Sequence, residues 1–201
     1  MHRTNFIKRG VTLEYFTIAY NSLEGLIALV AGFLAGSIAL VGFGFDSVIE
    51  VTSAVALLWR LHADADEAWR ERVEIITLRV VGSCFLVLAL YVGYEAISSV
   101  AYHELPERSV PGILLAVASL IVMPLLSRAK RGVARDIDSG AMRADAKQTE
   151  FCTYLSAILL GGLLLNALLG WWWADPVAAL VMVPIITKEG IEALRGDTCC
   201  D

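Results

Sequence analysis

Cysteine is scarce in this sequence of 201 residues, and its four cysteines are not arranged for cross-linking. Cys84 and Cys152 fall within apolar segments, and Cys199 and Cys200 close the sequence. This spacing excludes a disulfide framework. No short apolar region with a small-residue cleavage site follows the polar residues 1–10. We therefore expect no signal peptide.

Charged residues are also scarce. Only 18% of the residues are charged, and the formal net charge is −5. No basic stripe follows any stretch of the sequence, and a net negative charge disfavours binding to phosphates. A nucleic-acid partner is therefore excluded.

Long apolar runs are what the sequence has instead. Of its residues, 57% are hydrophobic, and several runs approach the roughly 20 residues that cross a bilayer. The sequence predicts an all-α polytopic membrane protein with a single transmembrane domain over residues 1–201. We do not expect it to be an enzyme. The six expected spans are 13–36, 37–59, 78–100, 112–127, 140–169 and 174–190.

The connections between the spans carry most of the polar residues. We expect a polar loop over 60–77 and a basic linker over 128–135, with Pro124 kinking or terminating the fourth span. Gly32 and Gly36 form a small-residue pair that favours close helix packing, and Gly36 and Ser37 predict a tight hairpin.

The basic residues predict the orientation. With the N-terminus inside the cell, fifteen of the 16 Lys and Arg residues fall on the cytoplasmic side of the membrane, and only Arg108 falls on the outer side. Cytoplasmic loops of membrane proteins are enriched in these residues. We therefore expect six spans in the inner (cytoplasmic) membrane, with both termini in the cytoplasm.

Two carboxylates interrupt the second span. Asp46 would lie ~14 Å along a helix from Ser37, near the middle of the bilayer, with Glu50 one turn further on the same face. A charge at this depth costs about 2.5–3.5 kcal/mol on insertion scales. A bound cation would offset this cost most directly, which indicates an ion pathway. The alternative is that both acids are protonated or hydrogen-bonded and only join helices.

A weak internal repeat supplies possible partners. An offset of 102 residues pairs Ser37 with Ser139, and it places Gln148 and Cys152 opposite Asp46 and Glu50. Two facing helices with two ligands each could form a tetrahedral site suited to Zn²⁺. A cysteine in a membrane helix can equally be a packing residue.

These motifs resemble the cation diffusion facilitator family. The resemblance rests on Gly36-Ser37-x-Ala39-Leu40 with Asp46-x-x-x-Glu50, on residues 91–95, on Ser139 with 144–146, and on residues 170–176. It implies a homodimeric exporter that exchanges Zn²⁺, or Mn²⁺, Fe²⁺, Co²⁺ or Cd²⁺, for protons. It also implies a transport site of acidic and His residues on the second and fifth spans.

The sequence departs from this family's pattern at two places. Gln148 and Cys152 stand where the family has His and Asp. The family's cytoplasmic C-terminal domain is expected to be missing, so that membrane helices would hold the homodimer. The sequence also resembles a vesicular transmembrane zinc-binding group that shares an acidic residue in the first span. This makes Glu24 a candidate ligand, with Asp145 a further one.

We therefore predict a proton-coupled exporter of Zn²⁺ or a similar divalent cation, with the metal as cargo and no prosthetic group. The predicted metal ligands are Glu24, Asp46, Glu50, Asp145, Gln148 and Cys152. The first alternative is a non-transporting membrane metal-binding or accessory protein, because Gln148 cannot release a proton. A membrane phosphotransferase is disfavoured, since further Asp and Arg positions to hold phosphates are lacking.

Overall fold

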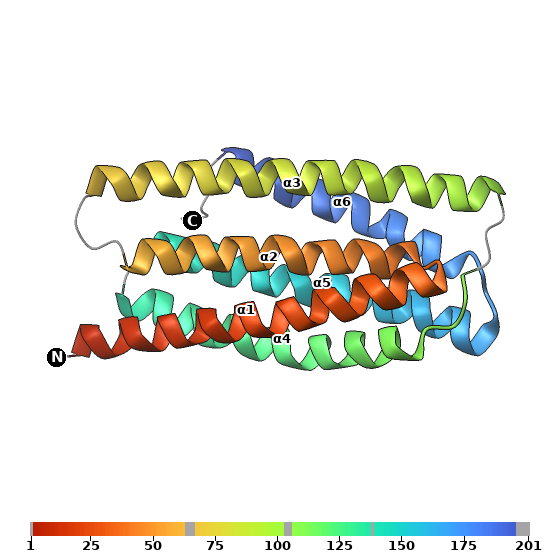
Figure 1. The fold of residues 1–201 in the computed structure, drawn as a ribbon, viewed down its shortest axis with the longest axis horizontal. Helices are drawn as coiled ribbons and strands as arrows, with labels where there is room; N and C mark the ends of the chain where they lie inside the picture. The colour runs from red at the N-terminus through yellow and green to blue at the C-terminus, as the bar shows by residue number, and fades with distance from the viewer. Residues whose placement is uncertain (1, 63–66, 103–105, 138, 196–201) are drawn as a thin grey trace.

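The computed structural model describes residues 2–62, 67–102, 106–137 and 139–195, and Cys199 and Cys200 lie outside these ranges. The described chain forms six helices and no strand, which confirms the predicted all-α architecture. They are α1 (His2–Ala35), α2 (Ile38–His62), α3 (Glu67–Tyr102), α4 (Val110–Ile137), α5 (Gly140–Leu169) and α6 (Ala174–Arg195) (Figure 1).

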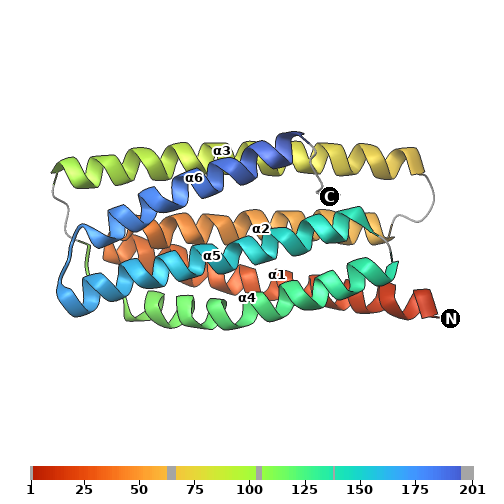
Figure 2. The same cartoon turned by 180° about the vertical axis from the view of Figure 1, so that it is seen from behind.

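Successive helices run in opposite directions, so α1 begins and α6 ends in the same half of the bundle (Figure 1). We call this half the terminal half. Helices α1, α2, α5 and α4 pack in a ring, each against the next. Helices α3 and α6 pair with one another and pack on one side of this ring, against α2 and α5 (Figure 2).

Five helices in the described part of the chain are long and apolar enough to cross a membrane. These segments are Phe6–Ala35, Ile38–Trp59, Leu78–Tyr102, Val110–Ile137 and Met142–Leu169. Helix α6 is not among them, since Asp175, Lys188 and Glu189 bound a shorter apolar stretch. It nevertheless runs through the bundle beside α3 and α5, as the predicted sixth span requires (Figure 2).

Two predicted connections are wrong. The basic linker over 128–135 is helical, because α4 continues through Pro124 to Ile137. The polar loop over 60–77 is also too long, since α2 reaches His62 and α3 begins at Glu67. Hydropathy marks where an apolar stretch ends, whereas a helix can continue into polar surroundings with all of its backbone hydrogen bonds intact.

The predicted hairpin between α1 and α2 is confirmed, but its two glycines have different roles. Gly36 adopts the left-handed conformation, with φ of 63°, and forms the turn. Gly32 lies against α2, where an added Cβ would stand 2.9 Å from the backbone nitrogen of Val41. Gly32 therefore permits the close approach of α1 and α2, and Gly36 does not take part in it.

Asp175 joins the start of α6 to the start of α2. Its carboxylate accepts a hydrogen bond of 2.5 Å from the Ser37 hydroxyl and one of 2.9 Å from the backbone N–H of Ile38. A carboxylate at a helix N-terminus satisfies free N–H groups and interacts favourably with the helix dipole. This contact fixes the end of α2 opposite the terminal half.

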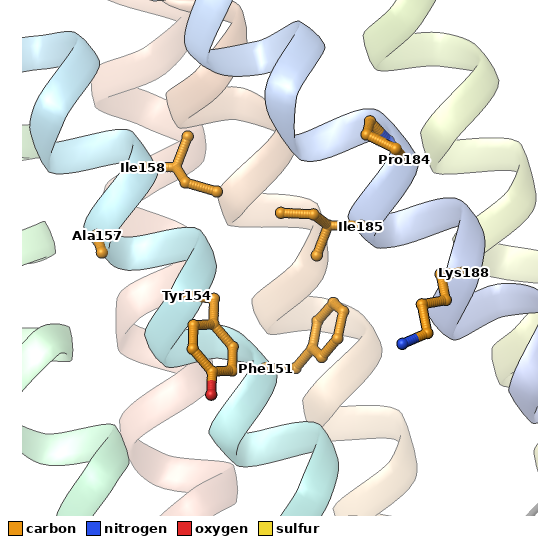
Figure 3. Close-up of a pocket in the computed structure, with 7 residues that line it drawn as sticks. All are labelled: Phe151, Tyr154, Ala157, Ile158, Pro184, Ile185 and Lys188. Carbon is orange, nitrogen blue, oxygen red and sulfur yellow. The ribbon is translucent and has the colours of Figure 1, made fainter.

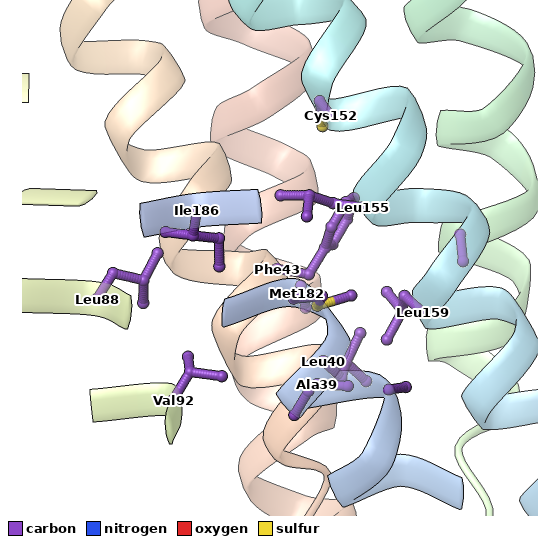
Figure 4. Close-up of a cluster of buried hydrophobic side chains, with 14 of the residues drawn as sticks. Ala39, Leu40, Phe43, Leu88, Val92, Cys152, Leu155, Leu159, Met182 and Ile186 are labelled. Carbon is purple, nitrogen blue, oxygen red and sulfur yellow. The ribbon is translucent and has the colours of Figure 1, made fainter. Parts of the chain in front are cut away.

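Apolar side chains from α2, α3, α5 and α6 fill the space between the ring and the outer pair. Phe43, Leu155, Met182 and Ile186 lie at the centre of this cluster, and all four are buried (Figure 4). Cys152 lies at one end of the cluster (Figure 4). The apolar core thus extends up to the helical turn of α5 that carries predicted site residues.

The glycine contact leads to a first prediction. Gly32→Ala should destabilise the protein by about 1–3 kcal/mol, because its methyl group would collide with the α2 backbone. Gly161→Ala is the matched control, since nothing lies within 4 Å of a Cβ at that helical position. Thermal unfolding in detergent measures both. Equal melting temperatures for the two variants would contradict the close approach of α1 and α2.

Candidate metal site

Three predicted ligands are buried near one another inside the four-helix ring. Glu24 of α1 and Asp46 and Glu50 of α2 are 1%, 4% and 1% exposed. Each lies within electrostatic range of another, because Asp46 interacts with both Glu24 and Glu50. The spacing of α2 places Asp46 and Glu50 one above the other, and α1 brings Glu24 to them across the hairpin.

Two hydroxyl groups hold these carboxylates by one oxygen each. The Ser47 hydroxyl donates to Glu24 Oε2 at 2.9 Å, and the Thr149 hydroxyl donates to Glu50 Oε1 at 2.7 Å. The second oxygens, Glu24 Oε1 and Glu50 Oε2, are buried and have no hydrogen-bond partner in the described structure. Buried carboxylate oxygens without a partner are unfavourable, and a cation would satisfy them.

Helix α5 contributes Cys152 and Gln148. The Cys152 thiol is 1% exposed and lies within electrostatic range of Glu24, Asp46 and Glu50. It also packs in the apolar cluster, so the structure is compatible with both predicted roles, metal ligand and packing residue. Gln148 is 8% exposed, and its side-chain nitrogen has no partner among the described residues.

Asp145, also predicted as a ligand, lies in a different environment. It contacts the Nζ of Lys130 at 2.5 Å, and the same ammonium contacts Glu14 Oε2 at 3.2 Å. The three side chains come from α5, α4 and α1, and their exposed fractions are 2%, 0% and 0%. We call them the lysine triad. In this structure Asp145 therefore pairs with a lysine and not with the other predicted metal ligands.

Sequence reasoning placed Lys130 in a cytoplasmic linker and did not single out Glu14. The prediction of a linker missed a helical pattern, because the buried face of α4 continues beyond residue 127. The buried positions at helical spacing are Met123, Leu126, Ser127, Lys130, Val133, Ala134 and Ile137. Extending the period of 3.6 residues through the basic segment would have placed Lys130 on the inner face.

The triad adjoins the other acids. Lys130 and Asp145 both lie within electrostatic range of Glu50, and the Thr149 hydroxyl, which donates to Glu50, also contacts the backbone carbonyl of Asp145 at 3.2 Å. We call the continuous set of buried carboxylates the acidic column. Its members are Glu14, Glu24, Asp46, Glu50 and Asp145.

The acidic column is not a closed coordination shell. Across the residues that the structure describes, no three His, Cys, Asp or Glu side chains stand close enough together to hold one metal ion. The predicted ligands are therefore neighbours along the bundle axis in this conformation. Metal binding at one point requires rotamer changes or a small movement of helices.

Helix α6 adds a carboxylate that the sequence reasoning did not propose. Glu189 is 9% exposed, lies within electrostatic range of Asp46, and has an unpartnered oxygen, Oε2, among the described atoms. An apolar groove of about 460 Å³ separates α5 from α6 nearby (Figure 3). Its lining residues are Phe151, Tyr154, Ala157, Ile158, Pro184, Ile185 and Lys188, and none of the predicted ligands is among them.

A bundle of apolar helices around buried carboxylates defines a class of membrane proteins that handle cations. The sequence model of one family, the cation efflux transmembrane domain, matches residues 15–197, and the chain belongs to this family. The match confirms the predicted resemblance.

Three relatives illustrate the range of this similarity. An uncharacterised transporter of Methanocaldococcus jannaschii is 27% identical over 88% of this chain and 64% of its own length. Transmembrane protein 163 of Xenopus laevis is 24% identical over 94% of this chain and 68% of its own. A cadmium, cobalt and zinc/H⁺-K⁺ antiporter of Bacillus subtilis is 24% identical over 92% and 62%. The chain thus spans just under two thirds of the first and third relatives.

The lysine triad leads to a second prediction. Lys130→Met should destabilise the protein by about 3–5 kcal/mol, because two buried carboxylates lose their cation. Arg131→Met is the matched control, one residue away. Its ion pair with Glu150, at 3.1 Å, is half exposed and should contribute at most about 1 kcal/mol. Chemical denaturation in detergent compares the two, and a smaller loss for Lys130→Met than for Arg131→Met would refute the assignment.

Proposed function

We propose that the chain exports a divalent metal cation, Zn²⁺ or a similar transition-metal ion, across the cytoplasmic membrane in exchange for protons. The observation that carries the proposal is the pair of unpartnered oxygens, Glu24 Oε1 and Glu50 Oε2, on buried carboxylates beside Asp46. Lys130 is the only buried cationic side chain in the described structure, and it is engaged by Glu14 and Asp145. A divalent ion would offset two of the three negative charges on Glu24, Asp46 and Glu50.

The transport cycle follows from the chemistry of carboxylates. Deprotonated Asp46 and Glu50 bind the ion while the site faces the cytoplasm, with Glu24 and Cys152 as further ligands. A rocking movement of the helices exposes the site to the other side. Protons then replace the metal on the carboxylates, because the two compete for the same oxygens.

Membership of the cation efflux family supports export as the direction of transport and a metal cation as the cargo. The Bacillus relative is named for cadmium, cobalt and zinc and for exchange against protons and potassium. The ligands present here refine the choice of metal. Carboxylates alone favour Mn²⁺ or Fe²⁺, whereas a thiolate from Cys152 favours Zn²⁺, Cd²⁺ or Co²⁺. Gln148 offers only a weak oxygen ligand. We further propose that two copies pair through membrane helices.

A second candidate function is a membrane metal-binding or accessory protein without transport. Gln148 favours it, because an amide cannot exchange a metal for a proton. The separation of the carboxylates in this structure favours it as well. Metal flux distinguishes the two functions, since an accessory protein would bind metal and move none.

The site leads to a third prediction. Asp46→Asn should abolish Zn²⁺ uptake into inverted membrane vesicles and leave the protein folded, because it removes an anionic ligand and relieves repulsion at Glu50. Glu150→Gln is the control, since Glu150 is half exposed and pairs with Arg131. Uptake by Asp46→Asn at the wild-type rate would place the transport site elsewhere.

Cys152 leads to a fourth prediction. If its thiolate is a ligand, Cys152→Ser removes one soft ligand and should weaken Zn²⁺ and Cd²⁺ binding by about tenfold or more. Mn²⁺ binding should change far less. The substitution nearly preserves volume, so packing should hold. Calorimetric titration in detergent measures all three metals. An equal loss for every metal would indicate a packing defect and remove Cys152 from the ligand set.

A further inference from the structure

The lysine triad has the form of an occupied cation site. Glu14 Oε2 and Asp145 Oδ2 both contact one ammonium, and the chain brings these two carboxylates together from α1 and α5 although the two acids stand 131 positions apart in the sequence. No part of the ammonium is exposed to solvent. The two acids are therefore arranged around a single positive charge.

The remaining oxygens of the two acids are also placed for a cation. Glu14 Oε1 and Asp145 Oδ1 are buried and have no hydrogen-bond partner in the described structure. A monovalent ammonium has three donors and one charge, and it leaves these two oxygens unsatisfied. A divalent ion accepts oxygen ligands from both sides and would satisfy more of them.

The surroundings of the triad match those of the predicted metal ligands. Glu50 lies within electrostatic range of Lys130 and Asp145, and Thr149, which donates to the Glu50 carboxylate, lies one helical turn after Asp145 on α5. A mobile metal ion bound at Asp46 and Glu50 would therefore find a second acidic position next to Glu50. The ammonium of Lys130 stands in that position.

We propose that Lys130 is a built-in cation that fills a second divalent-metal position formed by Glu14 and Asp145, and that it restricts the acidic column to one metal ion. The lysine acts by occupancy and by charge, since its ammonium repels a cation that approaches from Glu50. Asp145 is then a latent ligand, available only when the lysine is removed. The restriction to one ion of cargo rests on the proposed function.

The test is a count of bound metal on the full chain purified in detergent, with Mn²⁺ as the probe because it suits oxygen ligands. Wild type should bind one Mn²⁺ per chain. Lys130→Ala, which removes the ammonium and opens its space, should bind two. Lys130→Met removes the charge but fills most of the space, and it should bind one.

A second substitution locates the added ion. Lys130→Ala combined with Asp145→Asn should return to one Mn²⁺ per chain. If Lys130 is only a structural tie between helices, Lys130→Ala should bind no more metal than wild type, which would overturn the proposal. Wild type that already binds two ions, one of them lost in Asp145→Asn, would overturn it too.

Loss of the lysine could also unfold the protein, so a thermal measurement accompanies the count. Mn²⁺ should raise the melting temperature of Lys130→Ala well above its metal-free value, and it should not do so once Asp145→Asn is added. If Mn²⁺ neither raises the melting temperature of Lys130→Ala nor restores its folding, this would count against a metal position formed by Glu14 and Asp145.

The same data separate this proposal from the proposed function. If wild type binds one Mn²⁺ that Asp46→Asn removes, and Lys130→Ala gains none, the transport site stands and the role of Lys130 fails. If wild type binds none, and Lys130→Ala gains one ion that Asp145→Asn removes, the second position stands and the proposed function fails.

Discussion

The bundle buries more negative than positive charge, and its helix packing has to accommodate the difference. Five carboxylates of the acidic column lie inside the four-helix ring, and Lys130 is the one buried cation among the described residues. An uncompensated charge in a membrane interior is costly, so the column is stable only with further positive charge or with protons. The proposed proton-coupled transport would require exchange between these two states.

Specific helix contacts determine where the buried carboxylates lie relative to one another. The close approach at Gly32 brings Glu24 of α1 beside Asp46 and Glu50 of α2. Asp175 fixes the start of α2 to α6, so a movement of the outer pair of helices would be transmitted to the carboxylates. The lysine triad ties α1, α4 and α5 together in the terminal half.

The sequence predicted the features that depend on local pattern. The apolar runs and the hairpin at Gly36 predicted six helices in alternating directions, and the motifs around Asp46 and Glu50 indicated the family. The lysine triad joins Lys130 to Glu14 across 116 positions of sequence, and no local pattern contains such a contact. Lys130 was also misplaced, because a run of basic residues was interpreted as a loop although its helical period continues.

A transporter moves its metal ion across the membrane, whereas an accessory protein only binds the ion. The most direct measurement is the flux through the wild-type chain reconstituted alone in liposomes, with one dye inside for Zn²⁺ and another for pH. For a proton-coupled exporter we expect a Zn²⁺ gradient to drive Zn²⁺ into the liposomes while protons leave. Protein that binds Zn²⁺ in detergent but produces no flux above protein-free liposomes would contradict it.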